Sequence, residues 1–79
     1  MAAKLVAVTG ASGFLGGHVI AALAQSGARV RILMRSAPQP DPIWASVQPD
    51  FVPEIVSGDL SNPAALAALT TDADVILHC

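Results

Sequence analysis

The chain of 79 residues is short for one domain, and its composition is 53% hydrophobic and 13% charged, with a formal net charge of −2. A domain of this size buries only about 60% of the surface that its unfolded chain exposes, so the isolated chain should be marginally stable. No apolar stretch reaches the roughly 18 residues that cross a bilayer, and the basic residues are scattered, which argues against a membrane or nucleic acid as a partner. The apolar excess predicts surface that another part of a protein covers.

The N-terminus and the cysteine content indicate a compartment. The apolar run before Thr9 is shorter than the roughly 7–15 residues of a signal-peptide core. A single cysteine, Cys79, forms no internal disulfide, which fits a reducing environment. We therefore expect a cytoplasmic protein.

The first two predicted elements are a strand and a helix. Residues 4–9 are nearly all apolar and include β-branched side chains, as in a strand that is buried on both faces of a parallel sheet. Residues 14–26 follow the period of an amphipathic helix, which Gly27 ends. The predicted apolar face of this helix consists of Leu15, Val19, Ala22 and Leu23.

A second strand and an irregular crossover follow. Residues 29–34 alternate so that one face is apolar and the other begins polar, which indicates a strand near an edge of the sheet. The proline-rich residues 36–50 are weakly specified, although the Asp41-Pro42 pair could start a short helix. That helix would carry Ile43, Trp44 and Val47, with Trp44 in the core or in a lid contact.

The remaining elements complete an alternation of strands and helices. Residues 51–57 predict a third strand, which Pro53 assigns to an outer position. Asn62 and Pro63 are typical of a helix start, and residues 74–79 predict a fourth strand. This order predicts an α/β fold, one half of a doubly wound parallel sheet with helices on both faces.

The stretch VTGASGFLGG, residues 8–17, joins the first strand to the first helix. Such a junction directs the free N–H groups and the positive end of the helix dipole at one spot, where an anion can bind. Gly10 allows a sharp turn, Gly13 allows close approach of a diphosphate, and Gly16 allows the helix to pack closely. The alternative is an ordinary turn with a close helix contact.

This motif resembles TGxxGxxG of the short-chain dehydrogenase/reductase superfamily, and specifically TGASGFLG of its extended branch. The G-D-L at residues 58–60 and the D-V-I-L-H-C at residues 74–79 extend the resemblance over the whole chain. It implies that residues 1–79 are the N-terminal part of a Rossmann-type NAD(P)-binding domain. It also implies diphosphate contacts from the backbone N–H groups of Ser12, Phe14 and Leu15 and from the Ser12 hydroxyl, with the Phe14 and Leu15 side chains in the core.

Five further residues concern the cofactor. Arg35 stands where Rossmann domains distinguish the two dinucleotides, and an arginine there favours NADP over NAD, although it could be merely solvated. By the resemblance, Asp59 binds the adenine amino group and Leu60 lines the ring, with a helix-capping role as the alternative for Asp59. The resemblance also sets His78 and Cys79 beside the nicotinamide ribose, mainly through their backbone, with the His78 side chain in a packing role.

The residues that perform the superfamily's proton relay are missing. The resemblance implies a tyrosine in Y-x-x-x-K, yet the chain has no tyrosine, and its one lysine, Lys4, lies at the start of the first strand. No catalytic residue and no metal ligand is therefore assigned within residues 1–79. We expect the N-terminal portion of a longer NAD(P)-dependent reductase, epimerase or dehydratase that transfers hydride to or from a small-molecule substrate, and we leave a homodimer open. The alternatives are a non-catalytic redox sensor and a stand-alone binding module.

Overall fold

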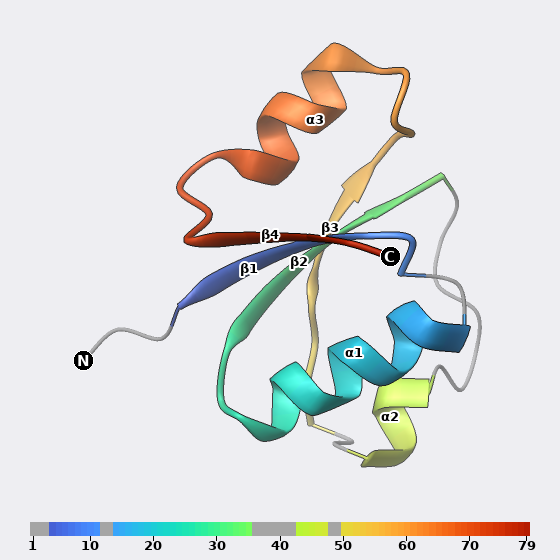
Figure 1. Ribbon diagram of the computed structural model, residues 1–79, viewed down its shortest axis with the longest axis vertical. Helices are drawn as coiled ribbons and strands as arrows, with labels where there is room; N and C mark the ends of the chain where they lie inside the picture. The colour runs from blue at the N-terminus through green and yellow to red at the C-terminus, as the bar shows by residue number, and fades with distance from the viewer. Residues whose placement is uncertain (1–3, 12–13, 36–42, 48–49) are drawn as a thin grey trace.

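The computed structural model describes residues 4–11, 14–35, 43–47 and 50–79. Its centre is a four-stranded sheet in the order β3-β2-β1-β4, in which each neighbouring pair is parallel. The helices α1 and α2 cover one face and α3 covers the other (Figure 1). The predicted α/β fold with helices on both faces is confirmed. The strands are β1 (Leu5–Thr9), β2 (Arg29–Met34), β3 (Glu54–Ser57) and β4 (Val75–His78), and the helices are α1 (Phe14–Gln25), α2 (Ile43–Val47) and α3 (Pro63–Thr70).

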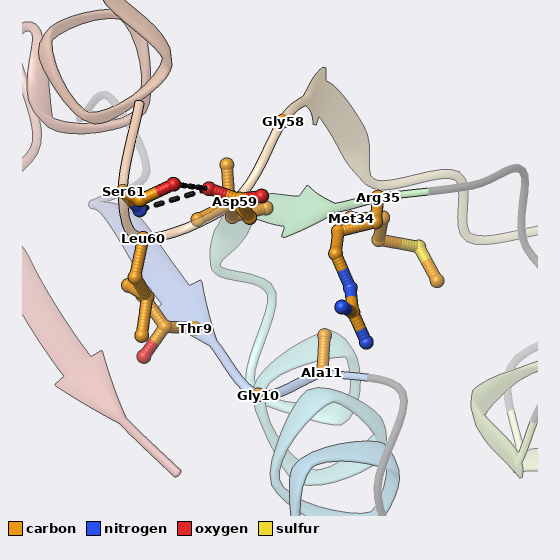
Figure 2. Close-up of a pocket in the computed structure, with 10 residues that line it drawn as sticks. Thr9, Gly10, Ala11, Met34, Arg35, Gly58, Asp59, Leu60 and Ser61 are labelled. Carbon is orange, nitrogen blue, oxygen red and sulfur yellow. Dashed lines mark hydrogen bonds between the residues drawn. The ribbon is translucent and has the colours of Figure 1, made fainter. Parts of the chain in front are cut away.

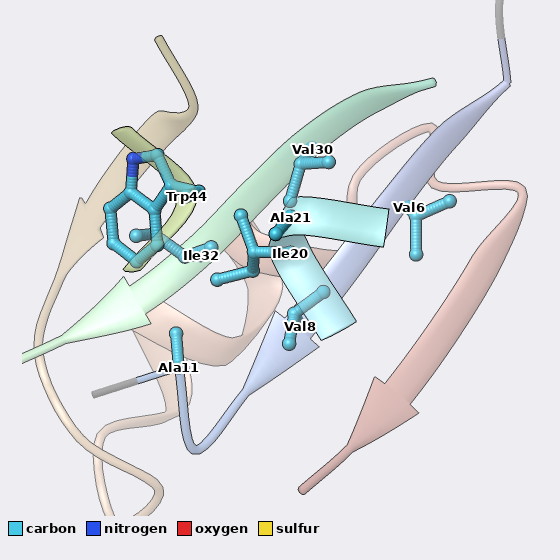
Figure 3. Packing of buried hydrophobic residues seen from close by; sticks show 8 residues of the cluster. All are labelled: Val6, Val8, Ala11, Ile20, Ala21, Val30, Ile32 and Trp44. Carbon is cyan, nitrogen blue, oxygen red and sulfur yellow. The ribbon is translucent and has the colours of Figure 1, made fainter. Parts of the chain in front are cut away.

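The larger core lies between the sheet and α1 with α2. Alternate residues of β1 and β2 point to this face, and Ile20 and Ile32 are completely buried in it (Figure 3). Trp44 packs into the same cluster from α2, as one of its two predicted roles requires. The buried members are Val6, Val8, Ala11, Ile20, Ala21, Val30, Ile32 and Trp44.

A smaller core lies beneath α3 on the opposite face. Ala65 and Leu69 of that helix pack against Ala7 of β1 and Leu33 of β2. The start of α3 follows the prediction, because the Asn62 side chain accepts hydrogen bonds from the amides of Ala64 and Ala65. These bonds satisfy two of the amides that have no partner within the helix.

The first helix turns a different side to the sheet than its sequence predicts. Leu15 and Ala22 of the predicted face are exposed, as is Phe14, whose ring stacks edge-on against His18 instead of entering the core. Because the helix is apolar on every side, its periodicity does not identify the buried face. The buried face is the one with small side chains, which let the helix approach the strands closely. The buried residues are Gly16, Gly17, Ile20, Ala21 and Ala24.

The second strand lies next to the outermost strand, near an edge of the sheet as predicted, although it is not the edge strand itself. It pairs with β1 on one side and with β3 on the other. Arg31, whose charge suggested an edge, donates to the backbone oxygens of Ala68, Leu69 and Thr71 at the end of α3. The third strand is outermost as predicted, but it begins only at Glu54, after Pro53.

Apolar side chains also remain on the surface, as the composition predicts. Several of them lie on the outer strands and in the turns at the ends of the sheet. None of the described helices is both long and apolar enough to cross a membrane. The exposed large side chains are Phe14, Leu15, Val52, Ile55, Leu60, Val75 and Ile76.

Candidate functional site

A groove of about 510 Å³ opens at the carboxyl-terminal end of the sheet, where β1, β2 and β3 end (Figure 2). Parallel strands direct their carboxyl ends to the same edge, so the residues that follow each strand meet there. Its volume lies within the roughly 300–1,000 Å³ of small-molecule sites. The lining residues are Thr9, Gly10, Ala11, Leu33, Met34, Arg35, Gly58, Asp59, Leu60 and Ser61.

The floor of the groove is the glycine turn after β1, where a side chain on Gly10, or on Gly16 in the first turn of α1, would collide with backbone atoms. Gly10 has a φ of 72°, and a Cβ on it would lie 2.7 Å from the carbonyl carbon of Cys79. A Cβ on Gly16 would lie 2.2 Å from the Gly10 carbonyl oxygen. The start of α1 therefore rests directly on the turn, as expected for Gly16.

Helix α1 begins at this turn and directs its first amides toward it. Phe14 and Leu15 are 79% and 65% exposed, so their side chains do not occupy the core that was expected to hold them. Ser12 and Gly13, the other predicted diphosphate contacts, lie outside the described residues. The first turn of the helix carries no acidic side chain that would compete with an anion for these amides.

Arg35 forms one side wall of the groove. It follows β2 directly, is exposed, and extends toward the side on which Ala11 lies (Figure 2). Among the described residues, no carboxylate forms a salt bridge with it. Its guanidinium is therefore available to an anionic group in the groove.

The opposite wall is the loop between β3 and α3, which contains Asp59. The Ser61 hydroxyl and amide both donate to Oδ1 of Asp59, at 2.5 Å and 2.9 Å (Figure 2). These two bonds, and then the positive charge of Arg35, hold the pKa of the Asp59 carboxyl below its ordinary value. Asp59 does not cap α3 with its side chain, because Asn62 does so.

The predicted residues at the end of β4 lie beside the turn. Thr9 is buried, and its Oγ1 lies 2.5 Å from Nδ1 of His78, its register partner on β4. The His78 side chain is exposed and bonded to Thr9, which differs from the packing role expected of it. Cys79 meets the turn through its main chain and its Cβ, and its side chain is exposed.

The structure thus brings Gly10, Arg35, Asp59 and Leu60 to one groove and adds residues that the sequence did not single out. Ser61 is the most informative of these, since an aspartate in a turn often accepts a hydrogen bond from the amide two residues on. No group of three or more His, Cys, Asp or Glu side chains that could hold a metal ion occurs in the described ranges.

Comparisons with known proteins agree with this geometry. The model of the NmrA-like family matches residues 2–79. A ceramide reductase from Caulobacter vibrioides is 47% identical over 74 residues, which cover 94% of this chain and 22% of that protein. The chain thus spans under a quarter of the length of this relative.

Solved structures give the same result. A short-chain dehydrogenase/reductase superfamily protein from Agrobacterium tumefaciens with bound NAD is 26% identical, with a TM-score of 0.72 over 96% of this chain and 20% of its own. Vestitone reductase from alfalfa is 29% identical, with a TM-score of 0.76 over 94% of this chain and 24% of its own. The predicted likeness to the extended short-chain dehydrogenases/reductases is confirmed.

Proposed function

Because the chain belongs to the NmrA-like family, we propose that residues 1–79 bind the adenosine and diphosphate part of a nicotinamide dinucleotide in a reductase. The observation that carries the proposal is the groove, in which a glycine turn, a cationic side chain and a carboxylate meet at the ends of three parallel strands. The similarity to a structure with bound NAD and to proteins named as reductases supports it.

The residues of the groove fit such a ligand. The turn at Gly10 offers backbone without side chains, and the first amides of α1 can donate to a diphosphate. Asp59 can accept from the adenine amino group, and the half-exposed Leu60 can cover the ring. The edge of the groove toward β4, where His78 and Cys79 lie, would receive the nicotinamide ribose.

Arg35 favours NADP over NAD as the ligand. A guanidinium binds phosphate through two parallel hydrogen bonds, and it can stack on adenine as well. The 2′-phosphate of NADP is the group that would meet it, since Arg35 lies in the groove with no ion pair among the described residues. A carboxylate that would accept from a free 2′-hydroxyl does not stand at this position.

The dinucleotide supplies the hydride, and this chain supplies binding and orientation. The proton relay must come from other parts of the protein, because the chain has no tyrosine and Lys4 precedes β1, at the end of the sheet opposite the groove. We therefore assign no catalytic residue to residues 1–79. The substrate is a small molecule with a carbonyl or alcohol carbon.

Arg35→Asp tests the assignment of the cofactor. We expect the ratio of NADPH to NADH affinity, measured by fluorescence titration of the protein that contains this chain, to fall by about tenfold or more. Lys4→Asp makes the same change of charge at the far edge of the sheet and should leave the ratio unchanged. An unaltered ratio in the Arg35 variant would refute the preference for NADP.

Turnover separates an enzyme from a redox sensor. A reductase consumes NADPH when a carbonyl substrate is present, whereas a sensor binds NADPH with the same groove and leaves it unoxidised. Saturable binding without turnover over a panel of small carbonyl compounds would support the sensor. Absence of binding of either dinucleotide would overturn the proposed function itself.

A further inference from the structure

Asp59 is an exposed carboxylate on a short loop, yet its orientation is fixed. Ser61 donates twice to the same oxygen, Oδ1, once from its hydroxyl and once from its amide. Within the described part of the chain, no residue donates to Oδ2. Oδ1 of Asp59 is therefore bonded to Ser61, and Oδ2 can accept a hydrogen bond from a ligand.

The loop that carries this pair is itself anchored. The Gly58 amide donates to the Met34 carbonyl oxygen at 3.0 Å, and the Asn62 amide donates to the Asp59 carbonyl oxygen at 3.1 Å. A Cβ on Gly58, whose φ is 145°, would lie 2.5 Å from the Cβ of Ala65, so the loop sits directly on α3. The carboxylate is thus held on β2 and α3 rather than on a free segment.

We infer that Ser61 is a positioning residue that aims Asp59 at the exocyclic amino group of the bound base and so makes the groove selective for adenine. This inference rests on the proposed function. A side chain that is already held in its binding orientation loses less conformational freedom when the ligand arrives. The two bonds from Ser61 also lower the pKa of the carboxyl, because they stabilise its ionised form.

The selectivity follows from donors and acceptors. An ionised carboxylate only accepts hydrogen bonds, so it pairs with the amino group of adenine. Hypoxanthine has a carbonyl oxygen at that position, which also only accepts, and it would face Asp59 without a shared proton. The preference between the two bases therefore measures how well the carboxylate is aimed.

The test compares NADPH with reduced nicotinamide hypoxanthine dinucleotide phosphate in the protein that contains this chain. We expect the wild-type protein to favour NADPH by about tenfold, as a hydrogen bond to a charged group gives. Ser61→Ala removes the hydroxyl bond to Oδ1 and keeps the amide bond, so it should lower this ratio severalfold by weakening NADPH binding, and Ser61→Thr should restore it. Asp59→Asn should raise the relative affinity for the hypoxanthine form, since an amide can donate to its oxygen.

The outcomes separate the inference from the proposed function. Loss of structure alone would weaken the binding of both dinucleotides equally and leave their ratio at the wild-type value, which would overturn the inference. A wild-type protein that binds both forms equally would overturn it as well. If the wild-type protein binds neither form, the groove is not a dinucleotide site and the proposed function fails together with the inference.

Discussion

A single added methyl group at Gly16 should disturb both stability and binding. The Cβ of Gly16→Ala would lie 2.2 Å from the Gly10 carbonyl oxygen and 2.9 Å from the Cα of Ala11, where ordinary contact begins at 3.4 Å. Both neighbours are backbone atoms, so no side-chain rotation relieves the contact. The start of α1 must move away from the turn by roughly 1 Å.

Two effects of opposite sign determine the change in the free energy of unfolding. Alanine is favoured over glycine inside a helix by about 1 kcal/mol, which would stabilise the variant if nothing else changed. Overpacking costs about 1–3 kcal/mol, and a contact with backbone belongs at the upper end of that range. We therefore expect the free energy of unfolding to fall by about 1–2 kcal/mol in Gly16→Ala.

Binding should suffer more than stability, because the displaced amides are those that we assign to the diphosphate. Urea denaturation measures the free energy of unfolding, and fluorescence titration measures the affinity for NADPH, which should fall by about tenfold or more. Ala22→Gly, on the exposed side of the same helix, gives the propensity effect alone and should cost about 1 kcal/mol with no change in affinity.

A more stable Gly16→Ala protein with unchanged affinity would refute this reasoning. It would mean that α1 can move away from Gly10 at no cost and that its first amides take no part in binding. A loss of stability with full affinity would leave the packing argument intact and remove the amides from the site.

Two further predictions concern α3. Arg31→Met should lower the free energy of unfolding by about 1–3 kcal/mol, because the side chain is 14% exposed and caps three carbonyl oxygens. The control Arg29→Met removes the salt bridge between Arg29 of the same strand and Glu54. The Arg29 side chain is 59% exposed, so this variant should lose under about 1 kcal/mol of stability. Equal losses in the two variants would contradict the capping role of Arg31. Asn62→Ala should lower the free energy of unfolding by about 1 kcal/mol, whereas Asn62→Asp keeps the cap and should not. An Ala variant as stable as the Asp variant would contradict the capping role of Asn62.

The sequence predicts most of the fold because its signals are local. The apolar run of residues 4–9 is typical of a buried strand, and the pair Asn62 and Pro63 is by itself typical of a helix start. The groove is predicted for the same reason. Gly10, Arg35 and Asp59 each follow a strand, and parallel strands bring such positions together.

The errors arise where a tertiary contact decides between equal local choices. Helix α1 offers apolar residues on every side, so close packing, not periodicity, buries Ile20 and leaves Leu15 exposed. The acceptors of Arg31, the carbonyl oxygens at the end of α3, lie 37 to 40 positions away along the chain, so the strand pattern alone does not contain them. The Thr9–His78 bond joins residues 69 positions apart, and no local pattern contains it.

The order of the strands has a consequence for synthesis on the ribosome. Of the strands described, β1 is made first and lies inside the sheet, and its second neighbour β4 is made last. The Leu5 amide donates to Asp74 across 69 positions, so that edge of β1 stays open while the intervening residues emerge. An open edge on a largely apolar strand invites pairing with other nascent chains, and slow closure of distant contacts prolongs the exposure. Translation speed and chaperone capture should therefore govern the yield of this protein.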